Sequence, residues 1–283
     1  MKKYIQITLT FNPPNIEIVS ELLWQLELNG ITEIDNGLII YCDIENIDIS
    51  KKIIEIMDKA EKEKIIETYL LNEEILEDKN WNAEYEKNVK VSEIGERIVI
   101  KPSFKEYITN DPKKIIITID PKMSFGTGEH ETTKLVLTLL EKYVRKNYKI
   151  LDVGSGTGIL AIASVMLGAD HAIAIDNDEW CLLNGGENVK LNNLELKVDI
   201  RLGEINDVAE DNFEIVTANI NKHILTDISD QLVFKMKNTG VLILSGILDS
   251  DENDILQTYT KHPVILIDRL QMNEWIALVF KHS

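Results

Sequence analysis

The stretch KILDVGSGTG (residues 149–158) decides the fold of the larger part of this chain. Its first half is an apolar run typical of a buried strand, and its second half carries Gly154, Gly156 and Gly158. The apolar segment ILAIASVMLGA (residues 159–169) follows directly and has a helix pattern. Glycines let the backbone approach a ligand closely, and the start of a helix offers N–H groups without partners in the helix. The stretch therefore predicts a strand, a loop that binds a nucleotide-like ligand, and a helix.

Two residues predict which ligand this loop binds. The dinucleotide pattern G-x-G-x-x-G needs glycine or alanine at Ile159, and the acidic Asp152 stands where a pyrophosphate would approach. A carboxylate here instead favours a positively charged ligand. S-adenosylmethionine carries a cationic sulfonium and an ammonium group, so we predict it as the cofactor, with Asp152, Gly154 and Gly156 at its site. A tight turn without a ligand, or a site for another nucleotide, is the alternative.

Strand and helix patterns alternate beyond Met123. Such alternation predicts an α/β fold in which a mostly parallel sheet has helices on both faces. The last two strand patterns are separated only by residues 271–273, too few for a crossover, so we expect an antiparallel C-terminal hairpin. The strand candidates are KILDVG (149–154), HAIAID (171–176), VDIRLG (198–203), FEIVTAN (213–219), VLILSGI (241–247), VILIDRL (264–270) and EWIALVF (274–280), and a helix pattern covers HILTDISDQLVFKMK (223–237).

Polar side chains stand where several of these strands end. Asp176 ends HAIAID, where a carboxylate can accept hydrogen bonds from both ribose hydroxyls of a nucleoside. We expect Asp178 to be a helix N-cap and Glu204 to be an exposed loop acid, although Glu204 could also border an adenine. Asn219 ends FEIVTAN and should face the crevice where open α/β sheets bind ligands. We predict that Asn219 positions a substrate amine rather than taking its proton, with a simple turn asparagine as the alternative.

The segment MSFGTGEHETTK (residues 123–134) precedes the sheet and is rich in glycine and hydroxyl side chains. It then enters a helix pattern with Thr132 or Thr133 near its start. We predict that the segment closes over the cofactor, whereas a loop followed by a threonine N-cap explains the pattern equally well. His130 and Glu131 make no zinc motif, because H-E-x-x-H needs histidine at Lys134, and we predict no metal site.

Residues 1–71 form the first predicted domain, residues 72–90 a charged connector and residues 91–283 the second domain. The first domain reads as a strand (4–10), a helix ending at Gly30 (16–30), two strands joined by Asn36-Gly37 (31–35 and 38–42), a second helix (50–62) and a fourth strand (65–71). The order βαββαβ predicts a small ferredoxin-like α+β domain. For the connector, another surface helix of the first domain is the alternative. Short strands in RIVIKPSF (97–104) and KIIITIDP (114–121) lead into the second domain.

Composition limits the partners and the compartment. The formal charge of −18 would repel a phosphate backbone, so we expect no direct nucleic-acid binding. The same charge favours a basic protein as the partner. Solubility alone also explains the charge. Cys42 and Cys181 form no CxxC pair, which indicates neither a disulfide framework nor a zinc site and fits a reducing cytoplasm. Gln6 and Thr8 interrupt the apolar run of a signal peptide, and no run approaches the ~20 apolar residues of a membrane span. We expect a cytoplasmic protein without a membrane segment.

Several segments together resemble the PrmA-type methyltransferases, which modify protein L11 of the large ribosomal subunit. The resemblance rests on FGTGEHETT (125–133), LDVGSGTGILAIAS (151–164), AIDND (174–178) and ANI (218–220), and it extends to NWNAEYEK (80–87) and KPSF (101–104). In the first domain it is limited to element order. Asn221 and Tyr85 depart from the leucine and tryptophan common in the family.

The resemblance implies a class I methyltransferase-like, Rossmann-like fold for residues 91–283. It implies that Thr133, Gly154, Asp176 and Asn219 contact S-adenosylmethionine, and it places Phe125 and Gly126 of its most specific segment beside them. The first domain would recognise the ribosomal protein, and the connector would let that domain swing. The implied reaction is methylation of lysine side-chain amines and the N-terminal α-amine, by in-line attack of a neutral amine in a pocket that excludes water.

Other functions remain open from the sequence. A methyltransferase acting on RNA or a small molecule shares the cofactor site, although the net acidity argues against RNA. A module that binds S-adenosylmethionine without catalysis is an alternative from a different class. A nicotinamide dehydrogenase is disfavoured by Ile159 and Asp152. We expect the chain to be a monomer.

Overall fold

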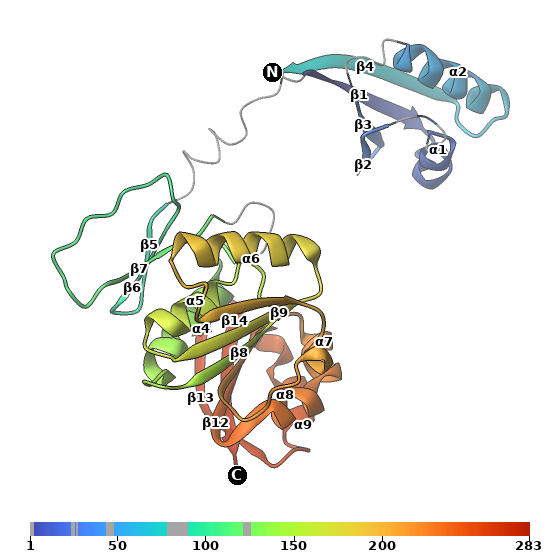
Figure 1. Cartoon of the computed structure of the whole chain (residues 1–283). Coiled ribbons are helices and arrows are strands. Elements are labelled where there is room, and N and C mark those ends of the chain that lie inside the picture. The colour runs from blue at the N-terminus through green and yellow to red at the C-terminus, as the bar shows by residue number, and fades with distance from the viewer. Residues whose placement is uncertain (1–2, 24–25, 27, 44–47, 78–89, 121–125) are drawn as a thin grey trace. The chain divides into compact units, whose positions relative to one another are not determined.

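The computed structural model of this chain describes residues 3–23, 26, 28–43, 48–77, 90–120 and 126–283. Contacts between residues divide the chain into two compact units, residues 1–88 and 89–283 (Figure 1). Tyr85, Phe125 and the connector residues 78–89 lie outside the described residues. Each unit has its own hydrophobic core, and the two are described separately.

The first unit has the element order βαββαβ that its sequence pattern predicted. Its four strands form an antiparallel sheet in the order β2-β3-β1-β4. Helix α1 is shorter than predicted, since it ends at Leu23 and Gly30 begins the next strand. The elements are β1 (Lys3–Asn12), α1 (Ile16–Leu23), β2 (Gly30–Ile34), β3 (Gly37–Asp43), α2 (Ile49–Lys62) and β4 (Thr68–Glu77).

Strand β4 corrects the predicted start of the connector. Residues 72–77, assigned from their charge to the connector, continue β4 and pair with β1 from Asn72 opposite Thr8 to Glu77 opposite Lys3. Glu73 and Glu74 are exposed on this edge strand. Charged side chains are compatible with an edge strand because its backbone pairs on one side while its side chains stay in water. The charge pattern therefore concealed a strand.

The hairpin between β2 and β3 uses a different turn from the predicted Asn36-Gly37 pair. Ile34 pairs with Gly37, so the two loop residues are Asp35 and Asn36, and Gly37 is the first residue of β3. A side chain at Gly37 would place its Cβ 2.0 Å from the backbone oxygen of Leu9 on the neighbouring strand β1. Gly37 is needed for close packing of two strands rather than for a left-handed turn.

Replacing Gly37 with alanine is expected to destabilise the first unit by about 1–3 kcal/mol, because β1 and β3 must move apart to admit the methyl group. Hydrogen exchange of peptides covering β1 and β3 measures this locally and should become faster. Gly30→Ala is the matched control, since a Cβ at Gly30 meets nothing within 4 Å. Equal exchange in the two variants would contradict the steric explanation.

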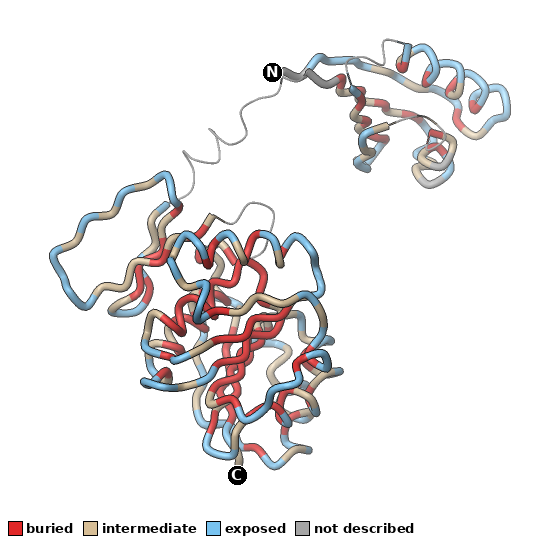
Figure 2. The backbone as a smooth tube through the Cα atoms, in the orientation of Figure 1, coloured by how far each residue is buried: buried red, intermediate tan, exposed pale blue. Residues whose placement is uncertain are grey.

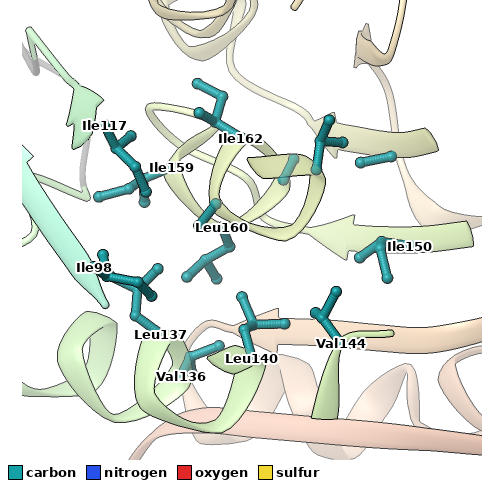
Figure 3. Close-up of a cluster of buried hydrophobic side chains, with 14 of the residues drawn as sticks. Ile98, Ile117, Val136, Leu137, Leu140, Val144, Ile150, Ile159, Leu160 and Ile162 are labelled. Carbon is teal, nitrogen blue, oxygen red and sulfur yellow. The ribbon is translucent and has the colours of Figure 1, made fainter. Parts of the chain in front are cut away.

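The second unit begins with a small three-stranded sheet formed by β5 (Ser92–Ile94), β6 (Ile98–Lys101) and β7 (Ile115–Thr118). Strand β6 pairs antiparallel with β5 and parallel with β7. Strands β6 and β7 lie in the two stretches predicted as short strands, residues 97–104 and 114–121. Ile98 and Ile117 from this sheet pack in one cluster with Leu137 of helix α4 (Glu131–Tyr143) and with Ile159 and Leu160 of helix α5 (Ile159–Met166) (Figure 3). The small sheet is thus part of the core of this unit.

The main sheet has seven strands in the order β10-β9-β8-β11-β12-β14-β13. Its first five strands are parallel, and β14 is antiparallel to both of its neighbours. The predicted C-terminal hairpin is confirmed, and the last strand inserts between β12 and β13. The strands are β8 (Lys149–Val153), β9 (His171–Asp176), β10 (Val198–Leu202), β11 (Phe213–Asn219), β12 (Met236–Leu248), β13 (Val264–Met272) and β14 (Trp275–His282).

Helices cover both faces of this sheet, as the alternating pattern predicted (Figures 1 and 2). Successive residues of a strand point to opposite faces, so Ile150 packs in the cluster with α4 and α5, whereas Leu151 packs in the cluster with α7, α8 and α9. The helix predicted over residues 223–237 is divided into α7 and α8, and its last residues, from Met236, begin β12. The helices are α4 (Glu131–Tyr143), α5 (Ile159–Met166), α6 (Glu179–Leu191), α7 (Lys222–Asp227), α8 (Ser229–Lys235) and α9 (Glu252–Tyr259), with short 3-10 turns η1 (Ile205–Asp207) and η2 (Asp249–Asp251).

None of the helices in the described part of the chain combines the length and the apolar composition that crossing a bilayer requires.

Candidate active site

The site lies where the strand order of the main sheet changes direction. Strand β8 has β9 on one side and β11 on the other, and the chain runs outward from it in both directions. The loops that follow β8, β9 and β11 therefore separate at the carboxyl edge of the sheet, which is where open α/β sheets bind ligands. Asp152, Asp176 and Asn219 stand at or beside the ends of these three strands.

The loop after β8 has the backbone conformation that its glycines predicted. Gly154 has φ of 72° and Gly156 has φ of 54°, in the left-handed region that side chains disfavour. A Cβ at Gly154 would also stand 2.2 Å from Cγ2 of Ile220. The amides of Gly154 and Ser155 both donate to the carbonyl of Ile175, at 2.9 and 3.2 Å, so the loop folds back over β9.

Asp176 holds this loop with its carboxylate. Oδ2 accepts from the amide of Gly156 at 2.9 Å, and Oδ1 accepts from the amide of Asp178 at 3.1 Å. Each carboxylate oxygen keeps a further lone pair, so the side chain is oriented before any ligand arrives and can still accept hydrogen bonds. Asp178 caps α6 by accepting from the amide of Trp180 at 2.9 Å, which confirms its predicted role as an N-cap.

A cleft of about 200 Å³ opens beside Asp176. Its polar lining includes Asp176 and Glu204, and its apolar lining comes from isoleucines on β9, η1 and α7. Glu204 is exposed, as predicted, and it also lines the cleft. The lining residues are Val153, Gly154, Ile175, Asp176, Asn177, Gly203, Glu204, Ile205, Asn206, Ile220, Ile224 and Ile228. Apolar walls with a carboxylate at one side suit a flat nucleoside whose sugar bears hydroxyl groups.

Several buried polar atoms around the glycine loop have no hydrogen-bond partner among the described residues. On the predicted site residues they are Oγ1 of Thr133, Oδ2 of Asp152 and Oδ1 of Asn219, and Oγ of Ser155, a loop residue that was not predicted, is another. Buried polar groups are normally satisfied in a folded protein, so atoms of this kind on a ligand-binding loop and its neighbouring strands are what a polar ligand would complete. These polar groups, two carboxylates and neutral oxygens, fit a cofactor with a positive charge and ribose hydroxyls.

Asp152 is fully buried beneath the loop. Its Oδ1 accepts from the hydroxyl of Thr217 at 2.8 Å. The pKa of the Asp152 carboxyl is raised from 3.8 to about 7, mainly by burial and in smaller part by the nearby Asp176 carboxylate, while hydrogen bonds from Thr217 and from the backbone of Ala161 oppose the shift. A cationic ligand group near the unpaired Oδ2 would favour the ionised form.

The stability of the ligand-free chain should consequently depend on Asp152 and on pH. Between about pH 4 and 7, Asp152 keeps its proton in the folded chain but loses it in the unfolded chain. The contribution of the Asp152 carboxyl to the free energy of unfolding is therefore complete below pH 3.8 and is lost as the pH rises to about 7. Asp152→Asn removes this dependence. The thermal midpoint of the variant minus that of the natural sequence should be larger at pH 8 than at pH 5. The exposed Asp170 provides the control Asp170→Asn, and an equal shift of the midpoint at both pH values in Asp152→Asn would contradict this explanation.

The segment before α4 is tied to the glycine loop at Gly126. The hydroxyl of Thr157 donates to the carbonyl of Gly126 at 2.7 Å. The cap of α4 is His130, whose side chain accepts from the amide of Thr132, so the alternative of a threonine cap is wrong. Thr133 lies in the first turn of α4 with 1% of its surface exposed. Phe125 lies outside the described residues, and its placement stays a prediction.

The structure thus connects most of the predicted site residues. Gly156 and Asp176 are hydrogen-bonded, Gly154 lines the cleft, and Asp152 and Asn219 lie on the neighbouring strands β8 and β11. The sequence analysis missed the apolar wall formed by Ile205, Ile220 and Ile224 of η1, the β11–α7 loop and α7. Isolated isoleucines near strand ends carry no motif, so only their place at the carboxyl edge of the sheet could have indicated them.

These features define a class I, S-adenosylmethionine-dependent methyltransferase: a parallel sheet with one antiparallel strand near its edge, a glycine-rich loop after the first strand of that sheet, and a carboxylate at the end of the second. The family model described as Ribosomal protein L11 methyltransferase (PrmA) matches residues 3–283. The chain belongs to this family.

Individual relatives agree with this assignment. The ribosomal protein L11 methyltransferase of Ruminiclostridium cellulolyticum is 37% identical over 73% of this chain and 66% of its own length. That of Alkaliphilus oremlandii is 30% identical over 99% of this chain and 98% of its own. The crystal structure of a ribosomal protein L11 methylase from Lactobacillus delbrueckii subsp. bulgaricus superposes with a TM-score of 0.65 at 28% identity, covering 69% of this chain and all of that one. The match with the Ruminiclostridium cellulolyticum protein spans about two thirds of that protein's length.

Proposed function

We propose that this chain transfers methyl groups from S-adenosylmethionine to amines of ribosomal protein L11, at lysine side chains and the N-terminal α-amine. The observation that carries the proposal is Asp176, which is held by the amide of Gly156 at the mouth of a cleft at the carboxyl edge of the sheet. The family assignment and the names of the relatives supply the substrate. Residues 1–77 would recognise the ribosomal protein, and residues 78–90 would connect the two units.

The cofactor would be held by groups already described. Asp176 would accept hydrogen bonds from the ribose hydroxyls, and Ile205, Ile220 and Ile224 would contact the adenine. The negative charge of Asp152 would favour the ammonium group, and Thr133 would offer its unpaired hydroxyl. The bound cofactor supplies an electrophilic methyl group on its sulfonium.

Asn219 would orient the amine that is methylated. Its Oδ1 is buried and unpaired among the described residues, and it can accept a hydrogen bond from an amine N–H. An amine held in this way directs its lone pair away from Asn219, and correct orientation is a large part of the rate of such a displacement. The amide cannot take the proton of a lysine ammonium, so the lysine must enter as the neutral amine, which a partly desolvated pocket favours by lowering its pKa.

The charge of the chain supports a basic protein substrate over RNA. At −18, it repels a phosphate backbone and attracts a lysine-rich surface. A monomeric enzyme acting in the cytoplasm is the form that we propose.

Incubation of the purified chain with methyl-labelled S-adenosylmethionine and separated ribosomal proteins and RNA tests the proposal. We expect label on one large-subunit protein, at lysine and N-terminal nitrogens located by peptide mass spectrometry. Label on RNA or on a small molecule would overturn the substrate and keep the cofactor. Binding of the cofactor without transfer to any component would favour a non-catalytic module.

A further inference from the structure

Helix α6 and its C-cap residue, Asn192, carry three asparagines on one side. Asn184, Asn188 and Asn192 follow one another at four-residue spacing, which places them in a row along the helix. Asn184 and Asn188 have 4% and 0% of their surfaces exposed. Asparagine is a poor helix former, and a buried amide is costly unless it is hydrogen-bonded, so tertiary contacts must compensate for this row.

The row binds the backbone at the end of β7 and just after it. Asn192 accepts from the amide of Thr118 at 2.9 Å and donates to its carbonyl at 2.7 Å. Asn188 accepts from the amide of Asp120 at 2.9 Å, and Asn184 donates to the carbonyl of Asp120 at 2.8 Å. Three side chains thus supply residues 118–120 with the hydrogen bonds that a neighbouring strand would otherwise supply.

Asn188 differs from the other two because it also reaches the glycine loop. Its Nδ2 donates to the carbonyl of Thr157 at 3.0 Å, while the hydroxyl of Thr157 donates to the carbonyl of Gly126 at 2.7 Å. Gly185 lies one turn earlier on α6, and its Cα is 3.7 Å from where a Cβ on Gly158 would stand, so α6 packs directly against the loop. Asp120 and Gly126 are therefore both fastened to Thr157, one through Asn188 and one directly.

We propose that Asn188 is a positioning residue for the cofactor. By holding the Thr157 carbonyl it fixes the loop whose Gly156 amide is bonded to Asp176, and it sets that loop against the backbone at Asp120. The loop keeps the shape that binds the cofactor only while this connection is made. The inference rests on the proposed function, since it concerns affinity for the same ligand.

Asn188→Ala and Asn192→Ala form a matched pair for the test. Each removes hydrogen bonds to the backbone at or just after the end of β7, so both should lower the thermal midpoint, but of the two only Asn188 bonds to the glycine loop. In the full-length chain, isothermal titration with S-adenosylmethionine should give a Kd about tenfold higher for Asn188→Ala, which corresponds to one lost hydrogen bond, and a Kd within about twofold for Asn192→Ala. In turnover assays, Asn188→Ala should raise the KM for the cofactor about tenfold while kcat at saturating cofactor falls less than about threefold.

Asn188→Asp keeps the proposal testable if Asn188→Ala does not fold. Aspartate keeps the oxygen that accepts from the amide of Asp120, but its carboxylate has no N–H to donate to the carbonyl of Thr157, so its Kd should also exceed that of Asn192→Ala. A Kd for Asn188→Ala or Asn188→Asp equal to that of Asn192→Ala would overturn the proposal. If the natural sequence itself bound no S-adenosylmethionine, the proposed function would be overturned, and the inference with it.

Discussion

Replacing Asp176 with alanine is expected to weaken the binding of S-adenosylmethionine by roughly 100-fold or more. The carboxylate would lose its hydrogen bonds to the ribose hydroxyls, and hydrogen bonds to a charged group contribute about 1.5–3 kcal/mol each. The same change removes the acceptor for the Gly156 amide, at 2.9 Å in the structure, so the loop also loses its orientation. Isothermal titration of the purified variant measures this loss directly.

Asp178→Ala is the matched control for this prediction. Asp178 is an aspartate on the same loop, but its side chain caps α6 through the amide of Trp180 and does not line the cleft. Removing the cap should cost about 1 kcal/mol of stability, with little change in the Kd of the cofactor. Similar losses of affinity in the two variants would mean that Asp176 acts through the stability of the loop alone.

Replacing Asn219 with alanine is expected to lower kcat by about 100-fold, because the substrate amine would lose the group that orients it. Affinity for the cofactor should change much less. Oδ1 of Asn219 is buried at the end of β11 without a partner among the described residues, so its removal breaks no hydrogen bond of the described fold. Single-turnover methylation of ribosomal protein L11 at saturating cofactor separates this effect from binding.

Asn221→Ala is the comparison, since Asn221 is an exposed asparagine two residues further on that makes no side-chain cap for α7. Its turnover should stay within about threefold of that of the natural sequence, as is usual for a surface substitution. Unchanged turnover in Asn219→Ala would remove Asn219 from the reaction and leave orientation of the amine to other groups.

Much of the site follows from the sequence because its signals are local. The three glycines stand together in one loop, and the backbone conformation that they permit depends on that loop alone. The strands ending at Asp176 and Asn219 have the bounds that their apolar runs predicted. Parallel strands present their carboxyl ends at one edge, so the order of the elements was enough to place Asp176 and Asn219 at the same edge of the sheet.

Other features depend on which segments become neighbours. The apolar wall of the cleft comes from η1, the loop after β11 and α7, which meet only when the sheet has formed. The helix pattern over residues 223–237 gave no sign that Met236 would begin β12. The charges of residues 72–77 suggested a connector, yet pairing with β1 makes them a strand. In each case a tertiary contact overrides the local pattern.

The sequence by itself determined the α/β class, the glycine loop, the acidic residue at the end of the next strand and the family of the chain. Hydrophobic period and turn chemistry are properties of neighbouring residues, so they can be recognised without the fold. Only the tertiary structure decided that β14 inserts between β12 and β13, that Asp152 is buried with a raised pKa, and that Asn188 connects α6 to Thr157. Burial and hydrogen bonding between residues distant in the chain depend on how the elements pack, which no local pattern specifies.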